Sequence, residues 1–388
     1  MRKTTLVGTL LAAAVLGACA DGQDPVSTAV ASDGALAPSF DVGGGSRGTV
    51  YTMTNDAAGN TVLAFDRAAD GTLAPAGMYS TGGLGTSAGL GNQGGLVLSE
   101  NGRWLFVVNA GSNDVSVFSR SPDGTLTLSD REPSGGSMPV SVTNSGWNVY
   151  VLNAGGSGNI AGLRLSPGGS LSPIAGSVQA LSQAGGTGPA QIGFTRNGRQ
   201  LVVAEKATNL LGVYALDGSG AADPGVFNAS SGATPFGFGF DNRGRLIVSN
   251  AAGGAPNASS VSSYQVLADG TLQVLAGAVP DHQTAACWIA ITRNGLFAYT
   301  TNAASNSTSG YRIGGQGGLS LLDANGVTGV NSGGPIDAAI SRTGGEYLYV
   351  LSGGAQSIDA FRVGPDGSLA PVGVQGGLPA GTNGLAAS

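Results

Sequence analysis

The chain has 388 residues, of which 10% are charged and 69 are glycine, and its formal net charge at pH 7 is −6. A negative balance disfavours nucleic acid and anionic membrane surfaces as partners, because both carry negative charge themselves. A charged fraction well below the usual share of about 25%, together with abundant glycine, favours small strands and tight turns over helices. We therefore expect an all-β fold without a role in binding DNA or RNA.

The N-terminus has the pattern of a bacterial lipoprotein signal. A positively charged start precedes an apolar run at residues 6–15, which ends in the letters LGAC at 16–19. The run is shorter than the about 20 residues that span a bilayer, and LGAC resembles a lipobox, which implies cleavage before Cys19 and acylation of its thiol. We expect a signal peptide at 1–18, and a chain that touches a membrane only through the lipid on Cys19. An ordinary signal peptide with a coincidental cysteine is the alternative.

The lipid would place the protein in the cell envelope, on the periplasmic side of a membrane or at the cell surface. Residues 19–46 lack sustained periodicity and are rich in Ala, Ser, Gly, Pro and Asp, which is typical of a flexible tether. We expect residues 47–388 to form the folded domain.

That domain is predicted to consist of seven copies of one repeat. Each copy has a strand that ends in Ser, Thr or Asp, a turn that contains glycine, and a second strand that ends in a polar residue. The turn glycines are Gly48, Gly102, Gly146, Gly198, Gly244, Gly295 and Gly345. Their spacing of 44 to 54 residues is that of a four-stranded propeller blade.

The chain ends explain how the ring would close. The first copy begins with its second strand, and residues 383–388 read as a lone strand that can supply the missing first one. Pairing of the two chain ends would remove the open edges of the sheet. We therefore expect a seven-bladed β-propeller, since an eight-stranded barrel or a sandwich would leave the terminal strand unexplained.

The turns divide the predicted propeller into two faces. The hairpins between the first and second strands, and between the third and fourth strands, are short and contain NGR or DGT, a strong turn signal. The longer connections lie on the opposite face, where binding residues are commonly found. The second strands end there, in Asn55, Asn109, Asn153, Glu205, Asn250, Asn302 and Ser352. We take Asn109, Asn153, Asn250 and Asn302 as candidate ligand-binding residues; capping of turns is the alternative.

Further candidates are rare residues on the same face. Lys206 follows Glu205 directly, and the letters PDHQTAACW at 280–288 contain His282, Cys287 and Trp288. We expect Cys287 and Trp288 to contact a ligand, and Lys206 and His282 to assist catalysis if there is any. The alternatives are a solvated lysine, a loop histidine and a buried cysteine.

Other motifs do not fit their context. The letters GLGNQG at 89–94 match a dinucleotide-binding pattern, but a strand follows them, and a phosphate site of this kind needs the N-terminus of a helix. No cysteine or histidine cluster has the spacing of a zinc site, and no loop has that of a calcium site. We expect neither a metal nor a cofactor.

Three segments carry a family resemblance. TGPAQIGFTRNGRQLVVAEKATN, TPFGFGFDNRGRLIVSN and CWIAITRNGLFAYTTN resemble the lactonase family of seven-bladed propellers, which includes 6-phosphogluconolactonases and carboxymuconate cyclases. The resemblance covers residues 48–388. It implies an Arg-His pair after a Gly-Pro at the start of an inner strand, and a Glu at the end of the next strand. Gly188, Pro189 and Glu205 match this pattern, whereas the pair is replaced by Ala190 and Gln191.

Three functions are compatible with the replacement of the Arg-His pair. Opening of a lactone needs a base that activates water and a cation that holds the anionic group and the developing oxyanion. Loss of Arg and His favours a non-catalytic propeller whose loop face binds a small lactone or carboxylate, or an envelope protein. The first alternative is a divergent lactonase or muconate cyclase in which Glu205 is the base and Gln191, Lys206 or His282 assists. The second is a purely structural surface protein.

Overall fold

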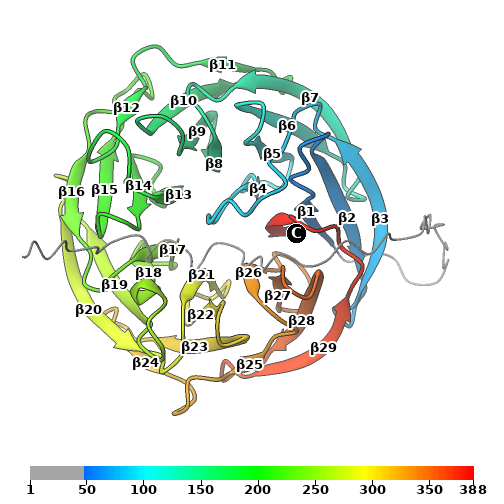
Figure 1. The fold of residues 1–388 in the computed structure, drawn as a ribbon, viewed down its shortest axis with the longest axis vertical. Helices are drawn as coiled ribbons and strands as arrows, with labels where there is room; N and C mark the ends of the chain where they lie inside the picture. The colour runs from blue at the N-terminus through cyan, green and yellow to red at the C-terminus, as the bar shows by residue number, and fades with distance from the viewer. Residues whose placement is uncertain (1–47) are drawn as a thin grey trace, which may run out of the picture.

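The structure is a computed structural model that describes residues 48–388 as seven antiparallel sheets around a central channel (Figure 1). The predicted seven-bladed propeller is thus confirmed. The signal peptide, Cys19 and the tether lie outside the described residues, so the lipid anchor stays a prediction. Within the described part, no helix is long and apolar enough to cross a membrane.

The strands of each blade are given from the channel outward. Blade 1 consists of β30 (Asn383–Ala387), β1 (Thr49–Met53), β2 (Thr61–Arg67) and β3 (Leu73–Ser80). Blade 2 consists of β4 (Leu96–Leu98), β5 (Trp104–Asn109), β6 (Asp114–Arg120) and β7 (Leu126–Pro133). Blade 3 consists of β8 (Pro139–Ser145), β9 (Asn148–Asn153) and β10 (Asn159–Leu165), whose outer edge pairs with β11 (Leu171–Pro173) and β12 (Gln179–Ala180).

The other four blades follow the same order. Blade 4 consists of β13 (Pro189–Phe194), β14 (Gln200–Glu205), β15 (Leu210–Ala215) and β16 (Val226–Ala229). Blade 5 consists of β17 (Pro235–Phe240), β18 (Leu246–Asn250), β19 (Ser260–Val266) and β20 (Leu272–Pro280), with the short 3₁₀ helix η1 (Ala252–Gly254) after β18. Blade 6 consists of β21 (Ala286–Ile291), β22 (Phe297–Asn302) and β23 (Ser307–Ile313), edged by β24 (Leu319–Leu321) and β25 (Gly329–Val330). Blade 7 consists of β26 (Pro335–Ile340), β27 (Tyr347–Ser352), β28 (Ser357–Val363) and β29 (Leu369–Gln375).

The two chain ends close the ring inside blade 1. Strand β30 pairs antiparallel with β1, as predicted. Thr49 N donates to Ser388 Oγ at 2.8 Å, and Thr52 Oγ1 donates to Gly384 O at 2.6 Å. The edge that a free β1 would expose is therefore paired within the blade.

A repeated tyrosine contact links neighbouring blades. In four blades a buried tyrosine of the second strand donates its hydroxyl to the carbonyl of the hairpin glycine in the next blade. The pairs are Tyr51 with Gly124 at 2.6 Å, Tyr150 with Gly220 at 2.8 Å, Tyr299 with Gly367 at 2.9 Å and Tyr349 with Gly71 at 2.8 Å. The hairpins that carry the Asp-Gly signal are thereby joined to the core between blades, because the tyrosine rings are buried there.

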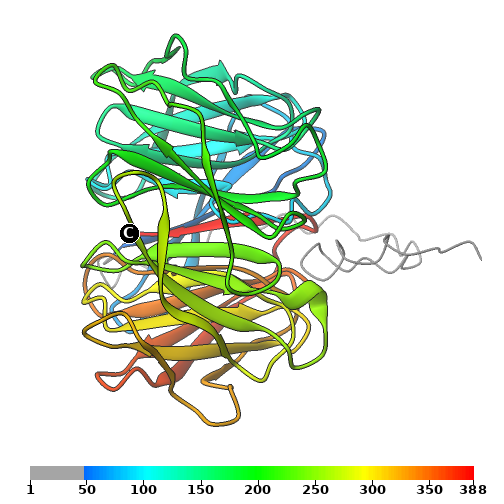
Figure 2. The same ribbon diagram turned by 90° about the vertical axis from the view of Figure 1, so that its left-hand side faces the viewer.

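The connections define two faces of the disc. We call turn face the side with the short hairpins, where β30 ends, and loop face the side with the longer connections. Figure 2 shows the disc from the side, with the C-terminus on the turn face. Each innermost strand runs from the loop face to the turn face, and its free edge borders the channel.

Candidate functional site

The four asparagines predicted to bind a ligand are fully buried at the ends of their strands. Asn109 Nδ2 donates to Asp114 Oδ1 at 2.6 Å and to Ser116 Oγ at 2.8 Å. Asn250, Asn302 and Asn153 make corresponding bonds, to Ser262 Oγ at 2.9 Å, Ser309 Oγ at 2.8 Å and Asn159 Oδ1 at 2.8 Å. These amides therefore connect the second strand to the third within a blade, and the structure places none of them on the lining of the channel cavity described below.

Glu205 ends β14 and is also fully buried. Its Oε1 accepts the backbone N–H of Ser182 at 3.0 Å, and its Oε2 accepts the hydroxyls of Ser182 and, at 2.7 Å, Thr208. Because Ser182 presents two donors, a group that only accepts hydrogen bonds fits this place better than the amide of an asparagine. The carboxylate thus ties the connection before β13 to the loop after β14.

Blade 7 has a corresponding contact, which is made by an aspartate. Asp359 accepts the backbone N–H of Ser332 at 3.0 Å, the hydroxyl of Ser332 and, at 2.6 Å, the hydroxyl of Ser352. The same pair of donors, N–H and O–H of one loop serine, is bound in both blades. A buried carboxylate at this level of a blade is accordingly a structural device of this chain, which accounts for a glutamate where most blades have asparagine.

Gln191 stands where the resemblance implies the histidine. Its side chain bridges two inner strands, because Nε2 donates to Phe238 O at 3.0 Å and Oε1 accepts Phe238 N at 2.6 Å. Gln191 lies on β13 and Phe238 on β17. The amide therefore joins blades 4 and 5, and Ala190 beside it is buried and carries no polar group.

Lys206 lies at the loop-face end of the channel. Its Nζ donates to Gly91 O and lies 4.7 Å from the centre of the Phe236 ring. Burial lowers the pKa of the Lys206 ammonium to about 8. The ring of Trp288 lies 5.0 Å from that of Phe236, and its Nε1 donates to Asn92 O at 2.7 Å. The structure thus brings Lys206 and Trp288 together around the segment that contains Gly91 and Asn92.

Of the remaining two candidates, one lies on the surface and the other in the core beside Trp288. His282 is exposed on the loop before β21. Cys287 is fully buried within β21, where its carbonyl accepts the hydroxyl of Ser249 at 2.7 Å. Within residues 48–388 no three acidic, histidine or cysteine side chains gather as a metal site requires.

The segment 90–95, which we call the channel segment, crosses the channel. Gln93 Nε2 donates to Ile289 O at 2.8 Å, and Gln93 Oε1 accepts Ile289 N at 3.0 Å. The backbone N–H of Gln93 donates to Ala190 O at 3.0 Å, and Asn92 Nδ2 donates to Val140 O. The channel segment therefore connects blade 1 to the first strand of blade 2 and contacts the inner strands of blades 3, 4 and 6. It contains most of the GLGNQG letters, which serve here as a channel closure followed by a strand.

A glycine of blade 5 leaves space for the side chain of Gln93. A Cβ atom on Gly237 of β17 would lie 2.0 Å from Gln93 Oε1 and 2.6 Å from Cys287 O. Neither distance is possible for real atoms, so the absence of a side chain at Gly237 is a condition for the Gln93 amide to reach Ile289. Sequence reasoning did not identify this role of Gln93 and Gly237, which are 144 positions apart.

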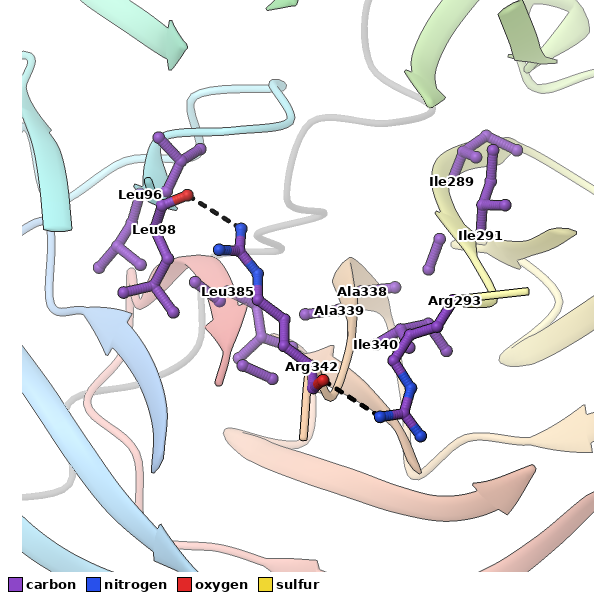
Figure 3. A pocket seen from close by; sticks show the side chains of 14 residues that line it. Leu96, Leu98, Ile289, Ile291, Arg293, Ala338, Ala339, Ile340, Arg342 and Leu385 are labelled. Atoms are coloured by element: carbon purple, nitrogen blue, oxygen red, sulfur yellow. Dashed lines mark hydrogen bonds between the residues drawn. The ribbon is translucent and has the colours of Figure 1, made fainter. Parts of the chain in front are cut away.

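An open cavity lies at the other end of the channel (Figure 3). It has a volume of about 320 Å³, and Leu96, Ile289 and Leu385 line it together with Arg293 and Arg342. Neither arginine is among the predicted site residues, because the site was expected on the loop face. Their signal was present in the turns after the first strands, TRNG and SRTGG.

The comparisons with known proteins agree with the sequence motifs. The model of the family described as lactonase, 7-bladed beta-propeller, matches residues 48–182. The fold defines a seven-bladed β-propeller, and the match shows that residues 48–182 are similar to the lactonase family. The family predicted from the motifs is thereby confirmed over the part of the chain that the match covers. No curated protein matches the chain.

Solved structures share the fold at low sequence identity. The periplasmic gluconolactonase PpgL of Pseudomonas aeruginosa is 17% identical, with a TM-score of 0.66 over 87% of this chain and 98% of that chain. A protein of Bacteroides fragilis, named as a candidate 6-phosphogluconolactonase, is 17% identical, with a TM-score of 0.66 over 88% and 98%. A Lactobacillus plantarum protein is 15% identical, with a TM-score of 0.65 over 88% and 99%. At these identities the likeness concerns the fold.

Proposed function

We propose that this chain is a ligand-binding propeller of the lactonase family that does not hydrolyse lactones. The observation that carries the proposal is the position of Gln191, whose two amide atoms are both bonded to the backbone of Phe238. Where the resemblance implies an Arg-His pair, this chain therefore has a link between blades. The expected ligand is a small carboxylate or a lactone-type molecule; an envelope protein is the alternative partner.

The state of Glu205 supports the same proposal. A general base must lie within hydrogen-bond reach of the water or hydroxyl from which it takes a proton. Both oxygens of Glu205 are bonded to the serine and threonine of two loops, and the side chain is fully buried.

A second candidate function is favoured by Lys206. Its pKa, lowered to about 8, gives a substantial fraction of neutral amine just above neutral pH, and a neutral amine can act as a base. A divergent lactonase or muconate cyclase would then use Lys206, and Glu205 beside it, after the channel segment has moved away from the Nζ atom. The two candidate functions differ in whether the protein turns over a lactone.

Hydrolysis measured in a pH-stat distinguishes them. The full chain, Glu205→Gln and Lys206→Met are each incubated with a panel of sugar lactones and carboxylated lactones, with an active propeller lactonase as the positive control. The proposal predicts that the full chain stays at the spontaneous rate for every substrate. A turnover by the full chain that disappears in either variant would establish the second candidate instead.

The envelope location rests on Cys19 and has its own test. We propose that the lipid on this cysteine is the chain's one attachment to the membrane. Metabolic labelling with a radioactive fatty acid is expected to label the full chain, and Cys19→Ala is expected to lose the label and leave the membrane fraction. Equal membrane recovery of the two proteins would contradict the anchor.

A further inference from the structure

The cavity at the turn face lies next to the channel segment. Leu96, which directly follows the channel segment, lines the cavity, and so does Ile289, whose backbone binds Gln93. The outer end lies where β21 and β26 turn into their hairpins, beside Arg293 and Arg342. A volume of about 320 Å³ is within the range of small-molecule sites, about 300 to 1,000 Å³.

The side chains on the lining are of two kinds. Of the 14 described residues, twelve are Leu, Ile, Val or Ala and the other two are Arg293 and Arg342. These side chains include no hydroxyl, amide or carboxylate, so the only side-chain partners for the hydroxyl groups of a sugar would be two guanidinium groups. Hydroxyl groups that lose water without gaining partners are costly to bury. The side chains of the lining therefore favour an aliphatic body, and the backbone groups at the free edges of the inner strands add polar contacts beside them.

Arg342 brings a positive charge to the outer end. Its Nη2 donates to Leu98 O at 2.9 Å and its Nη1 donates to Ser99 O, so its side chain reaches from blade 7 to blade 2 across the mouth (Figure 3). Both partners are neutral carbonyl groups. Among the described residues no carboxylate lies within ion-pair distance of Arg342. The charge of Glu100 acts on it from farther away, so the guanidinium can still bind an anion directly.

Arg293 lies beside Arg342, and its positive charge is partly neutralised by Glu346. Its Nη1 donates to Arg342 O at 3.1 Å, and its Nε lies 3.6 Å from Glu346 Oε1. Further exposed arginines lie on the hairpins after the first strands of blades 2, 4 and 5, which surround the same mouth: Arg103, Arg196, Arg199 and Arg243. Glu100 is an exposed acid on the same ring. A mostly basic rim on an acidic protein draws anions toward the mouth.

From this geometry we propose that the turn-face cavity binds an aliphatic monocarboxylate of medium chain length. The carboxylate lies on Arg342, with Arg293 beside it, and the hydrocarbon chain points along the Leu, Ile and Ala side chains toward Gln93. The charge-assisted hydrogen bond to a guanidinium fixes the head group, and burial of the chain among aliphatic groups supplies affinity. This inference rests on the proposed binding function and gives it a site and a ligand class.

Isothermal titration of the full chain with octanoate tests the proposal. We expect saturable binding of one octanoate per chain, and at least about tenfold weaker binding of 1-octanol, which lacks the charge, and of gluconate, which lacks the apolar chain.

Arg342→Leu is expected to weaken octanoate binding about tenfold or more. Ala339→Leu narrows the cavity and is expected to weaken it comparably. Arg196→Gln, an exposed arginine on the same ring outside the lining, is the matched control and is expected to bind as the full chain does.

Three results would overturn the proposal. They are no saturable octanoate binding, equal binding of octanoate and octanol, and unchanged octanoate binding in both Arg342→Leu and Ala339→Leu. Thermal melts of every variant establish that it is folded; if Arg342→Leu does not fold, Arg293→Gln takes its place. Lactone hydrolysis is measured on the same samples, because turnover would contradict the proposed function, whereas absent octanoate binding without turnover would contradict this inference alone.

Discussion

Glu205 and Gln191 lie at two positions for which the family resemblance implies functional residues, and the side chains of both are bonded within the protein. In this chain each is bonded on both of its polar side-chain atoms, Glu205 to loop residues and Gln191 to the next inner strand. Their energetic contribution is to the fold, because a buried polar group that loses its partner costs free energy. Predictions at the scale of the residue therefore concern stability.

Glu205→Gln tests the structural role of the carboxylate. The amide replaces an acceptor by a donor in front of hydroxyl and N–H groups that donate at present. We expect the free energy of unfolding to fall by about 1 to 3 kcal/mol, measured by denaturant titration. Glu100→Gln changes the same group at an exposed position and is expected to stay within about 0.5 kcal/mol. Equal effects of the two substitutions would contradict the structural role.

Asp337 makes stability depend on pH. It is buried on β26, where its carboxylate accepts Ala338 N at 2.7 Å and Leu385 N at 3.0 Å, and burial raises its pKa to about 8. An unfolded aspartate has a pKa of about 3.9, so between about pH 4 and 8 the folded chain keeps a proton that the unfolded chain has lost. The free energy of unfolding from this group therefore falls as pH rises through that window.

Asp337→Asn removes this dependence. The variant should gain stability relative to the unmodified chain as pH rises from 4 to 8, measured by thermal melts at each pH. Comparison of the two proteins cancels the other titrating groups. Parallel pH profiles would show that the Asp337 carboxyl titrates alike in the folded and unfolded chains.

At the scale of the element, the channel segment is the feature that distinguishes the two ends of the channel. It depends on bonds between Gln93 and Ile289, 196 positions apart, and on the missing side chain of Gly237. Gly237→Ala should push the Gln93 amide out of place and lower the free energy of unfolding by about 1 to 3 kcal/mol, the usual cost of overpacking. Denaturant titration measures the change.

Gly376→Ala provides the control for that substitution. No atom lies within 4 Å of the Cβ that it would add, so its effect is expected to stay below about 1 kcal/mol. If the two alanine variants were equally stable, Gln93 would have no fixed place in the channel.

The strands and hairpins could be predicted from the sequence because their signals lie within a few neighbouring residues. Hairpin signals and alternating strands recur at each blade, and the lone strand at 383–388 predicted the closure. The channel segment could not be predicted in this way, because its partners are distant in sequence and its letters resembled a nucleotide motif. The contacts of Gln191 were equally hidden, since the partner of its side chain is the backbone of Phe238.

At the scale of the whole molecule, closure by β30 holds seven blades in one ring. Removal of residues 383–388 would leave β1 with an unpaired edge, and blade 7 would lose its contacts with that strand, including the bond from Leu385 N to Asp337. We expect the truncated chain to aggregate and to elute in the void volume in size-exclusion chromatography, ahead of the full chain. Ser388→Ala keeps the strand and is expected to stay soluble; a soluble, cooperatively unfolding truncation would contradict the role of β30.

The two faces of the disc also differ in what they offer a ligand. The loop face carries the predicted site residues, which are largely bonded within the protein or exposed singly, and the channel segment lies across its opening. The turn face has the cavity, with aliphatic walls and arginines at the mouth. We therefore propose that the protein binds a ligand without turnover and that the ligand enters from the turn face.

A crystal structure of the full chain with octanoate tests this claim most directly. The account predicts the carboxylate on Arg342 and the hydrocarbon chain between the aliphatic walls, with Gln93 still bonded to Ile289 and Glu205 still bonded to Ser182. A ligand bound on the loop face against Glu205 and Lys206, with the channel segment displaced, would contradict it.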